Sequence, residues 1–167
     1  MASKPKIKIE TSQLDVFLDI ILMAFVIGII VIPLYHLMNL PDQIPIHFDI
    51  KGKADGFGSK YSILLIAGIG IGLAIMLWWL RRYPHLMNFP FEINDSNAAV
   101  NYKMIIRFLN VINILTTLLF LIVILLIINT AKGNDVSFYT VFLYLDIAAI
   151  FISMIIYFIV AGNVNKK

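Results

Sequence analysis

The sequence of 167 residues contains no cysteine and few charged side chains. The lack of cysteine excludes a disulfide scaffold, thiolate zinc sites, iron–sulfur clusters and cysteine nucleophiles. Charged residues make up 14% of the chain, whereas an average soluble domain contains about 25%. Because so few charges cannot form a water-soluble surface, the composition excludes an ordinary soluble protein.

Apolar residues are abundant instead, at 60% of the chain, and the mean hydropathy is +0.91. They form four blocks, at about 14–38, 62–80, 104–130 and 136–161. At 1.5 Å per residue, even the shortest block is about 28 Å long, close to the roughly 30 Å of a hydrocarbon core. The sequence therefore predicts an all-α membrane protein, a four-transmembrane-helix bundle that forms a single integral membrane domain over residues 1–167. The lipid bilayer is its first expected partner.

The basic residues predict the orientation of this bundle. Eight lie on one side of the four blocks: Lys4, Lys6, Lys8, Arg81, Arg82, Lys103, Lys166 and Lys167. Four lie on the other side: Lys51, Lys53, Lys60 and Lys132. Since lysine and arginine favour cytoplasmic loops, we expect a multi-pass protein of the cell membrane with both termini in the cytoplasm. The scattered basic residues do not form the patch that a nucleic acid would need.

Polar residues inside the apolar blocks are costly in lipid and therefore informative. Asp19 and Arg107 lie at similar depth in the first and third blocks, which predicts an ion pair that positions two helices; a proton or ion relay is the alternative. Asn110 and Asn113 share one face of the third helix. Asp146 lies near mid-membrane in the fourth block, where a carboxylate is expected to be protonated or to line a wet cavity. These polar groups are read as interhelical hydrogen bonds or, alternatively, as a substrate or proton path.

Small residues recur in the second block. Gly68 and Gly72 form a G-x-x-x-G pair, and Gly70 and Ala74 repeat its spacing. Because small residues four apart let two helix backbones approach closely, the pattern predicts tight packing within the monomer or between copies in a homo-oligomer.

The connector at 39–61 alternates apolar and polar residues, which predicts an extended strand followed by a turn at Gly52. We expect a short hairpin over the outer end of the bundle. Its apolar face is expected to carry Ile44, Ile46, Phe48 and Ile50. On the polar face, His47 is expected to bond a backbone group, and Asp55 or Lys60 to hold the turn. A metal site made by His47 and Asp49 with nearby carboxylates is the less favoured alternative, because its spacing matches no metal motif.

This connector resembles the DUF1648 family of bacterial membrane proteins. The residues that carry the resemblance are Pro45, His47, Phe48, Asp49, Gly52, Asp55 and Lys60, in this order and spacing. A looser similarity continues to Tyr102, and the four-helix layout agrees with the family. One relative, the immunity protein of the sporulation-delaying-protein toxin system, protects the producing cell and captures a transcriptional repressor at the membrane. That relative carries a further membrane module, so only the shared domain is carried over.

The outer-loop motif and the small inner surface predict a non-enzymatic membrane protein that binds or senses an extracytoplasmic ligand, such as a peptide, a toxin or a lipid. The resemblance adds a cytoplasmic repressor as a partner. A small oligomeric transporter component is the alternative, based on Asp146 and the polar face of the third helix. An enzyme is disfavoured because the chain contains no nucleophile elbow, no H-E-x-x-H motif and no phosphate loop. No cofactor and no metal are expected.

Overall fold

The computed structural model describes residues 4–166 and contains four long helices with one hairpin between the first two. The elements are α1 (Gln13–Leu37), β1 (Gln43–Phe48), β2 (Ala54–Ser59), α2 (Ser62–Leu80), the short 3-10 helix η1 (Pro84–Leu86), α3 (Ala98–Ala131) and α4 (Ser137–Val164). All four helices are long and apolar enough to cross a membrane. The predicted fold class, four membrane helices with a short hairpin, is confirmed.

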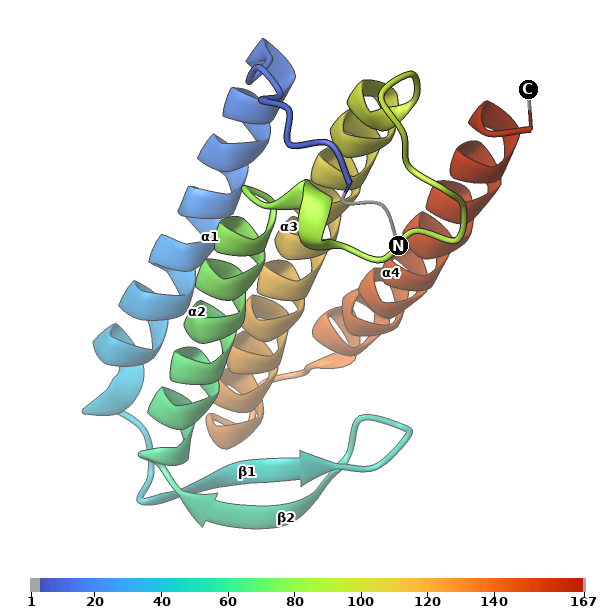
Figure 1. Ribbon diagram of the computed structural model, residues 1–167. Helices are drawn as coiled ribbons and strands as arrows, with labels where there is room; N and C mark the ends of the chain where they lie inside the picture. Colours follow the sequence, from blue (N-terminus) through green and yellow to red (C-terminus); the bar gives the residue numbers. More distant parts are fainter. Residues whose placement is uncertain (1–3, 167) are drawn as a thin grey trace.

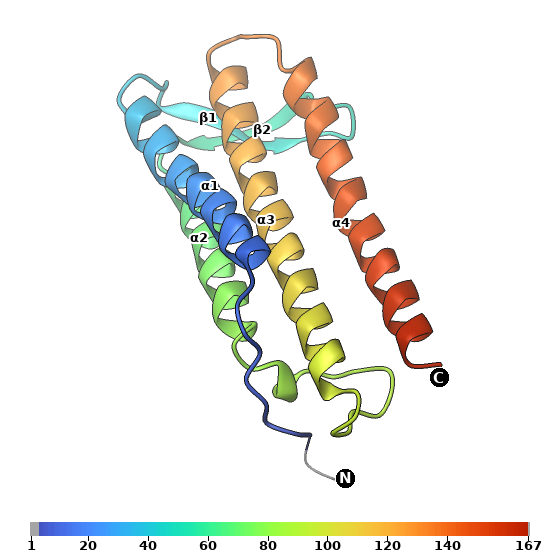
Figure 2. The same cartoon turned by 90° about the horizontal axis from the view of Figure 1, so that it is seen from above.

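The four helices run alternately in opposite directions, and the two strands lie across one end of the bundle (Figures 1 and 2). We call this the hairpin end, and the opposite end, with both chain termini and the loop 81–97, the tail end. α3 lies at the centre and packs against the other three helices, whereas α4 packs mainly against α3. Lys167, one of the basic residues counted above, lies outside the described residues.

The helix boundaries agree with the apolar blocks to within a few residues, except at two ends. α3 begins at Ala98, six residues before the block predicted from residue 104, and α4 extends to Val164. Both extensions lie at the tail end, where the sequence is less apolar. The helices therefore continue beyond the stretch that hydropathy alone marks as spanning.

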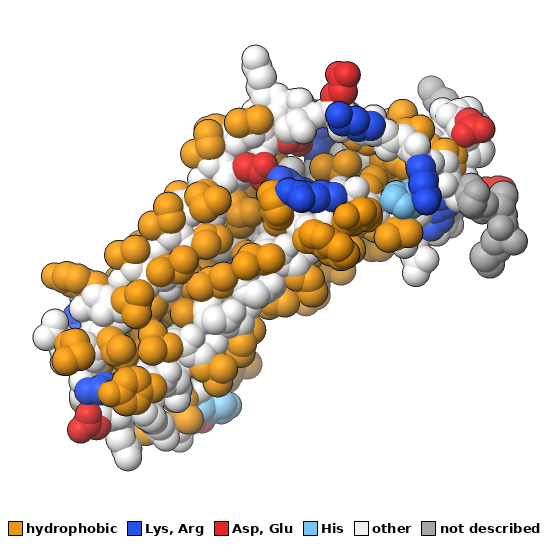
Figure 3. Space-filling model, turned by 60° about the vertical axis from the view of Figure 1, so that its left-hand side comes forward, with side chains coloured by type: hydrophobic (Ala, Val, Ile, Leu, Met, Phe, Trp, Pro, Cys, Tyr) orange, Lys and Arg blue, Asp and Glu red, His pale blue; other side chains and the backbone are white. Residues whose placement is uncertain are grey.

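The outer surface of the bundle is apolar over its middle. Large hydrophobic side chains such as Phe151 and Ile159 on α4 are more than half exposed. Figure 3 shows hydrophobic side chains covering the middle of one face, with charged side chains gathered at the two ends. This is the pattern expected of helices whose solvent is lipid. The protein is a multi-pass membrane protein.

Residues at the start of α1 form a capping box. The Ser12 hydroxyl accepts a hydrogen bond from the Asp15 backbone N–H, and the Asp15 carboxylate accepts one from the Ser12 backbone N–H at 2.8 Å. Such a box satisfies two of the amide groups left free in the first turn of a helix. Asp15 is buried, and the capping box supplies its hydrogen-bond partners at the start of α1.

The close packing of α2 against α3 depends on Gly70. A β-carbon at this position would lie 2.8 Å from the Phe120 ring, whereas Gly68 and Gly72 face open space in the described chain. The predicted close packing by small residues is therefore made by Gly70 and the buried Ala74. Among the described residues, close approach of the helices therefore does not depend on the G-x-x-x-G pair.

The N-terminal segment before α1 has no strand within residues 4–12. Its Ile9 packs against a small core made by Ile93, Ala98 and Tyr102, as do Phe89 and Phe91. The Tyr102 hydroxyl donates to the Pro5 carbonyl oxygen at 2.9 Å. Side-chain contacts, rather than a backbone ladder, hold the segment across the tail end.

Candidate functional site

The two strands of the hairpin pair in antiparallel fashion with two irregularities, between Pro45 and His47 and between His47 and Phe48. These irregularities break the strict alternation of faces that the sequence suggested. Ile44 is fully buried in the core and Pro45 is also buried, but Ile46 is 48% exposed and Ile50 is 87% exposed. Ile44 therefore packs against the helix ends, and Ile46 and Ile50 point away from that core.

His47 and Asp55 face each other across the hairpin. The Nδ1 atom of His47 is hydrogen-bonded to a carboxylate oxygen of Asp55, and their side chains are 71% and 48% exposed. The predicted backbone partner of His47 is therefore wrong: the carboxylate of the opposite strand takes that place. Of the candidate residues in the family motif, these two side chains present the most accessible polar surface.

Asp49 and Gly52 shape the tip of the hairpin. The Asp49 carboxylate accepts hydrogen bonds from the backbone N–H groups of Lys51 and Lys53, each at 2.8 Å. Gly52 has a φ of 78°, and a β-carbon there would lie 2.7 Å from the Thr140 hydroxyl oxygen on α4. Both the backbone conformation and the close approach therefore require glycine.

Lys60 closes the base of the hairpin. Its ammonium group lies 3.0 Å from the Asp42 carboxylate, and its backbone N–H donates to the Asp42 carbonyl oxygen. Phe48 is half-buried and packs against the core at the hairpin end. The motif residues thus bond mostly within the hairpin. The turn is held by Asp49, whereas Asp55 bonds to His47 and Lys60 to Asp42 at the base of the hairpin. Within residues 4–166, no three His, Asp or Glu side chains lie together as a metal site would require.

The hairpin tip also contacts α4. The Tyr144 hydroxyl donates to the Ile50 carbonyl oxygen, one helical turn beyond the contact between Gly52 and Thr140. Nothing in the sequence of either segment signals this contact, because a tyrosine near a helix end usually indicates only a membrane interface.

A second polar cluster lies at the tail end and joins three helices. Arg81, at the end of α2, donates two hydrogen bonds to the Asp19 carboxylate at 2.6 and 2.7 Å and one to the Asn110 side-chain oxygen at 2.6 Å. The predicted pair of Asp19 with Arg107 is therefore wrong, and Arg107 is exposed. Arg107 has a suitable depth, but it forms no salt bridge within residues 4–166. A long arginine just past the end of α2 was the available signal for the true partner.

The polar face of α3 continues toward mid-membrane. Asn113 donates to the Ala74 carbonyl oxygen on α2 at 3.0 Å, and Thr117 donates to the Asn113 carbonyl oxygen at 2.7 Å. The first of these bonds joins α3 to α2, as side-chain hydrogen bonds do between helices in lipid, whereas the second lies within α3. Asp146 on α4 is 5% exposed, and neither of its carboxylate oxygens has a hydrogen-bond partner within residues 4–166.

The hairpin and its flanking helices carry the family signal. Residues 20–71 match the family model of DUF1648, a domain of unknown function. This DUF1648 segment contains α1 from Ile20, the whole hairpin and α2 as far as Ile71, so it contains all the motif residues named above. The resemblance is confirmed over this segment, whereas the looser pattern up to Tyr102 lies largely beyond it. No curated protein and no solved structure matches the chain.

Proposed function

We propose that this non-enzymatic membrane protein binds a peptide at its hairpin, outside the cell, and transmits the binding event to the cytoplasmic tail end. The protein would thereby act in immunity or signalling. The proposal follows from the DUF1648 segment and from the resemblance to the toxin-immunity protein. The structure adds a path by which the hairpin can influence the opposite end.

The observation that carries the proposal is the position of α4. Near its start, Thr140 and Tyr144 contact the hairpin tip. At its other end, Asn165 exchanges two side-chain hydrogen bonds with Asn101 at 2.9 and 3.0 Å and accepts one from Asn97 at 3.2 Å. Because α4 otherwise packs mainly on α3, this single continuous helix connects the hairpin tip with the tail end. A ligand that binds two positions of the tip with different affinity would shift this helix.

The chemistry of the exposed hairpin surface fits an amphipathic peptide. Ile46, Ile50 and Phe57 are each about half exposed or more, at 48%, 87% and 59%, beside the polar pair of His47 and Asp55. An apolar surface of this kind at a membrane interface suits a membrane-active peptide better than a small ion. The cytoplasmic partner at the tail end would be a repressor.

The binding experiment measures protection of a sensitive bacterium against a toxin of the sporulation-delaying type. We expect cells expressing the protein to survive, and the double variant Ile46→Ser/Ile50→Ser to lose protection while inserting normally. Lys53→Ala, an exposed change on the same hairpin, is the matched control. Equal protection by all three proteins, at equal membrane levels, would show that the hairpin surface does not bind the toxin.

The proposed orientation has a separate test. Because the chain has no cysteine, Lys51→Cys and Lys6→Cys each provide one label site, at the hairpin tip and in the N-terminal segment. A maleimide that cannot cross membranes is expected to label position 51 on intact cells, and position 6 only after lysis. The reverse result would place the hairpin in the cytoplasm.

A small transporter component is the second candidate, and Asp146 favours it, since a buried carboxylate without a partner is typical of ion or proton pathways in membranes. In this case, flux of protons or cations into proteoliposomes would occur with the parent protein and be lost in Asp146→Asn. Thr116→Ala, a polar change on α3, provides a control for altered helix packing.

A further inference from the structure

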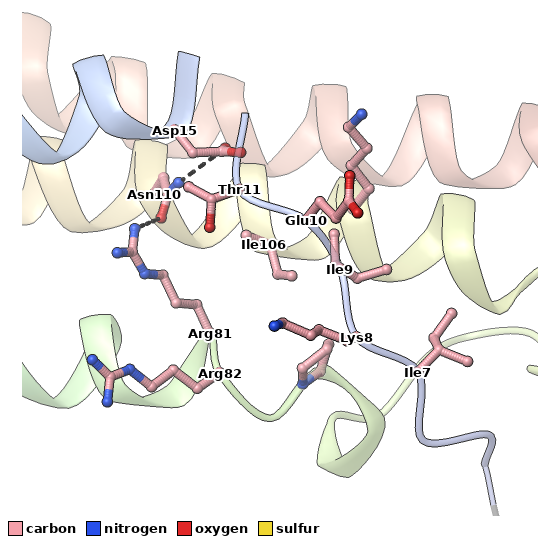
Figure 4. Close-up of a pocket in the computed structure, with 12 residues that line it drawn as sticks. Ile7, Lys8, Ile9, Glu10, Thr11, Asp15, Arg81, Arg82, Ile106 and Asn110 are labelled. Carbon is pink, nitrogen blue, oxygen red and sulfur yellow. Dashed lines mark hydrogen bonds between the residues drawn. The ribbon is translucent and has the colours of Figure 1, made fainter. Parts of the chain in front are cut away.

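A cavity of about 360 Å³ opens at the tail end, between the N-terminal segment and the ends of α1, α2 and α3. Its charged lining residues are four basic side chains and two acidic ones: Lys8, Arg81, Arg82, Lys103, Glu10 and Asp15. Figure 4 shows Arg81 reaching Asn110 from α2 and Lys8 extending from the N-terminal segment toward the end of α2. The cavity is therefore built by parts of the chain that are far apart in sequence.

Internal bonds already satisfy the buried acidic groups around this cavity. Asp15 is bonded to Ser12 in the capping box and accepts from the Asn110 side chain at 3.5 Å. Asp19, directly behind the cavity, is neutralised by two hydrogen bonds from Arg81. These carboxylates are therefore poor ligands for a cation, and the remaining charge of the cavity is positive.

Three of the basic groups remain available to a ligand. Within residues 4–166, Lys8, Arg82 and Lys103 form no salt bridge with a carboxylate. The Arg82 guanidinium lies 3.8 Å from the centre of the Trp78 ring, which holds it at the membrane end of the cavity. Lysine and arginine groups gathered in this way bind phosphate oxygens, arginine through paired N–H donors.

An apolar groove adjoins the cavity and indicates the source of the phosphate. The groove, about 410 Å³ in volume, lies between α1 and α2 and is lined by Asp19, Leu22, Met23, Val26, Ala74, Ile75 and Trp78. The groove meets the cavity at the ion pair of Asp19 with Arg81, since Asp19 lines the groove and Arg81 lines the cavity. From there the groove runs along α1 and α2, away from the cavity. A free phosphate would occupy the cavity alone, whereas a lipid would place its headgroup there and an acyl chain in the groove.

We propose that this cavity and groove form a site for an anionic phospholipid, with the phosphate bound by Lys8, Arg82 and Lys103 and an acyl chain beside Trp78. Basic pockets among membrane helices recognise anionic headgroups in this way. The site would tie the N-terminal segment to the helices in a membrane rich in such lipids. It uses none of the hairpin residues, so its failure would leave the proposed function untouched.

The experiment uses tryptophan fluorescence, because Trp78 and Trp79 are the two tryptophans of the chain. In the full-length Trp79→Phe variant, Trp78 reports contact with lipids whose acyl chains carry bromine, a quencher at close range. The protein is reconstituted in vesicles containing brominated phosphatidylglycerol or brominated phosphatidylcholine at equal fractions. We expect phosphatidylglycerol to be preferred about tenfold, because lysine and arginine groups near the membrane surface attract anionic lipids.

Charge-matched variants show whether the preference belongs to this cavity. Lys8→Gln/Lys103→Gln is expected to reduce it to about twofold or less, while leaving Arg82 and Trp78 in place. Lys6→Gln/Lys166→Gln removes the same charge from the same end of the protein, outside the cavity, and is expected to keep it. Equal losses in both pairs would show general surface attraction and overturn the proposal. Inorganic phosphate that abolished the preference, or altered Trp78 emission in phosphatidylcholine vesicles, would assign the cavity to a soluble anion and also overturn it.

Discussion

The two ends of the bundle use polar residues in opposite ways. At the hairpin end, each polar motif residue bonds to a group within about 20 positions along the chain: His47 to Asp55, Asp49 to its own turn, and Lys60 to Asp42. At the tail end, Arg81 bonds to a residue 62 positions away in sequence. The motif residues of the hairpin thus bond within the hairpin, with Tyr144 as a long-range contact to α4, whereas the tail-end cluster joins three helices.

This difference has an energetic consequence. The bonds of the hairpin end are largely exposed, so water can replace them at little cost. The bonds of the tail end lie among membrane helices, where an unpaired charge has no substitute partner. Disruption of the tail end should therefore destabilise the whole bundle, whereas disruption of the hairpin should alter binding with little change in stability.

The largest expected effect comes from Arg81→Gln. Asp19 would keep its charge without its partner, and Asn110 would lose a donor. Breaking one side of a buried ion pair costs about 3–5 kcal/mol, and we expect about 2–3 kcal/mol here because the Asp19 side chain is 35% exposed. The thermal unfolding midpoint in one detergent measures the change.

Two further variants test the identity of this pair. Arg107→Gln removes an exposed charge from α3 and is expected to leave the midpoint nearly unchanged. Asp19→Asn combined with Arg81→Gln is expected to recover part of the loss, since no unpaired charge remains. A midpoint lowered equally by Arg107→Gln and Arg81→Gln would contradict the assigned pairing.

A middle-sized effect is expected from Gly52→Ala at the hairpin tip. The positive φ of Gly52 and the approach of Thr140 both oppose a side chain, so the variant should be destabilised by about 1–3 kcal/mol. Gly68→Ala, in open space on α2, is the matched control and should be neutral or stabilising by up to about 1 kcal/mol. Thermal unfolding of both variants measures the difference.

The double variant Gly52→Ala/Thr140→Ala separates the two causes. Truncation of Thr140 removes the steric contact but not the backbone strain, so partial recovery is expected. Complete recovery would show that the positive φ costs nothing at this position, and no recovery would show that the tip does not press on α4.

A small effect on stability is expected from His47→Ala. The pair with Asp55 is exposed, and exposed ion pairs contribute about 0–1 kcal/mol. The thermal unfolding midpoint should therefore move only slightly in His47→Ala, and to a similar extent in Asp55→Ala. Protection against the toxin is expected to fall in both variants. A large loss of stability in either single variant would mean that this pair holds the fold and would remove the contrast between the two ends.

Sequence reasoning succeeded where the information was local. Apolar blocks gave the helices, and Gly52 with the alternating residues before it gave the hairpin. It failed for Asp19, because the depth of a residue in the membrane does not fix the direction in which its helix face points. The irregular register of β1 around His47 left no sequence signal. The contact of Tyr144 with the hairpin tip left no signal, since it depends on how two distant segments pack.

The smallest expected effect concerns Asp135, a further local bond at the hairpin end. Its carboxylate accepts hydrogen bonds from the backbone N–H of Ser137 at 3.0 Å and from the Ser137 hydroxyl at 2.7 Å, just at the start of α4. These bonds, the backbone one first, lower the pKa of Asp135 below its ordinary value of 3.8.

This lowered pKa makes the stability depend on pH. Because the pKa is lower in the folded state, the contribution of these bonds to stability is fully present above pH 3.8. It is lost as the pH falls through the folded value. The protection of the Ser137 amide against exchange, measured by NMR relative to an unstructured peptide at the same pH, should fall as Asp135 is protonated in the parent protein and lose this pH dependence in Asp135→Asn. Because Asp135 lies at the hairpin end, the same titration should leave the amides near Arg81, at the tail end, unchanged. An equal response near Arg81 would show that the two ends are energetically coupled.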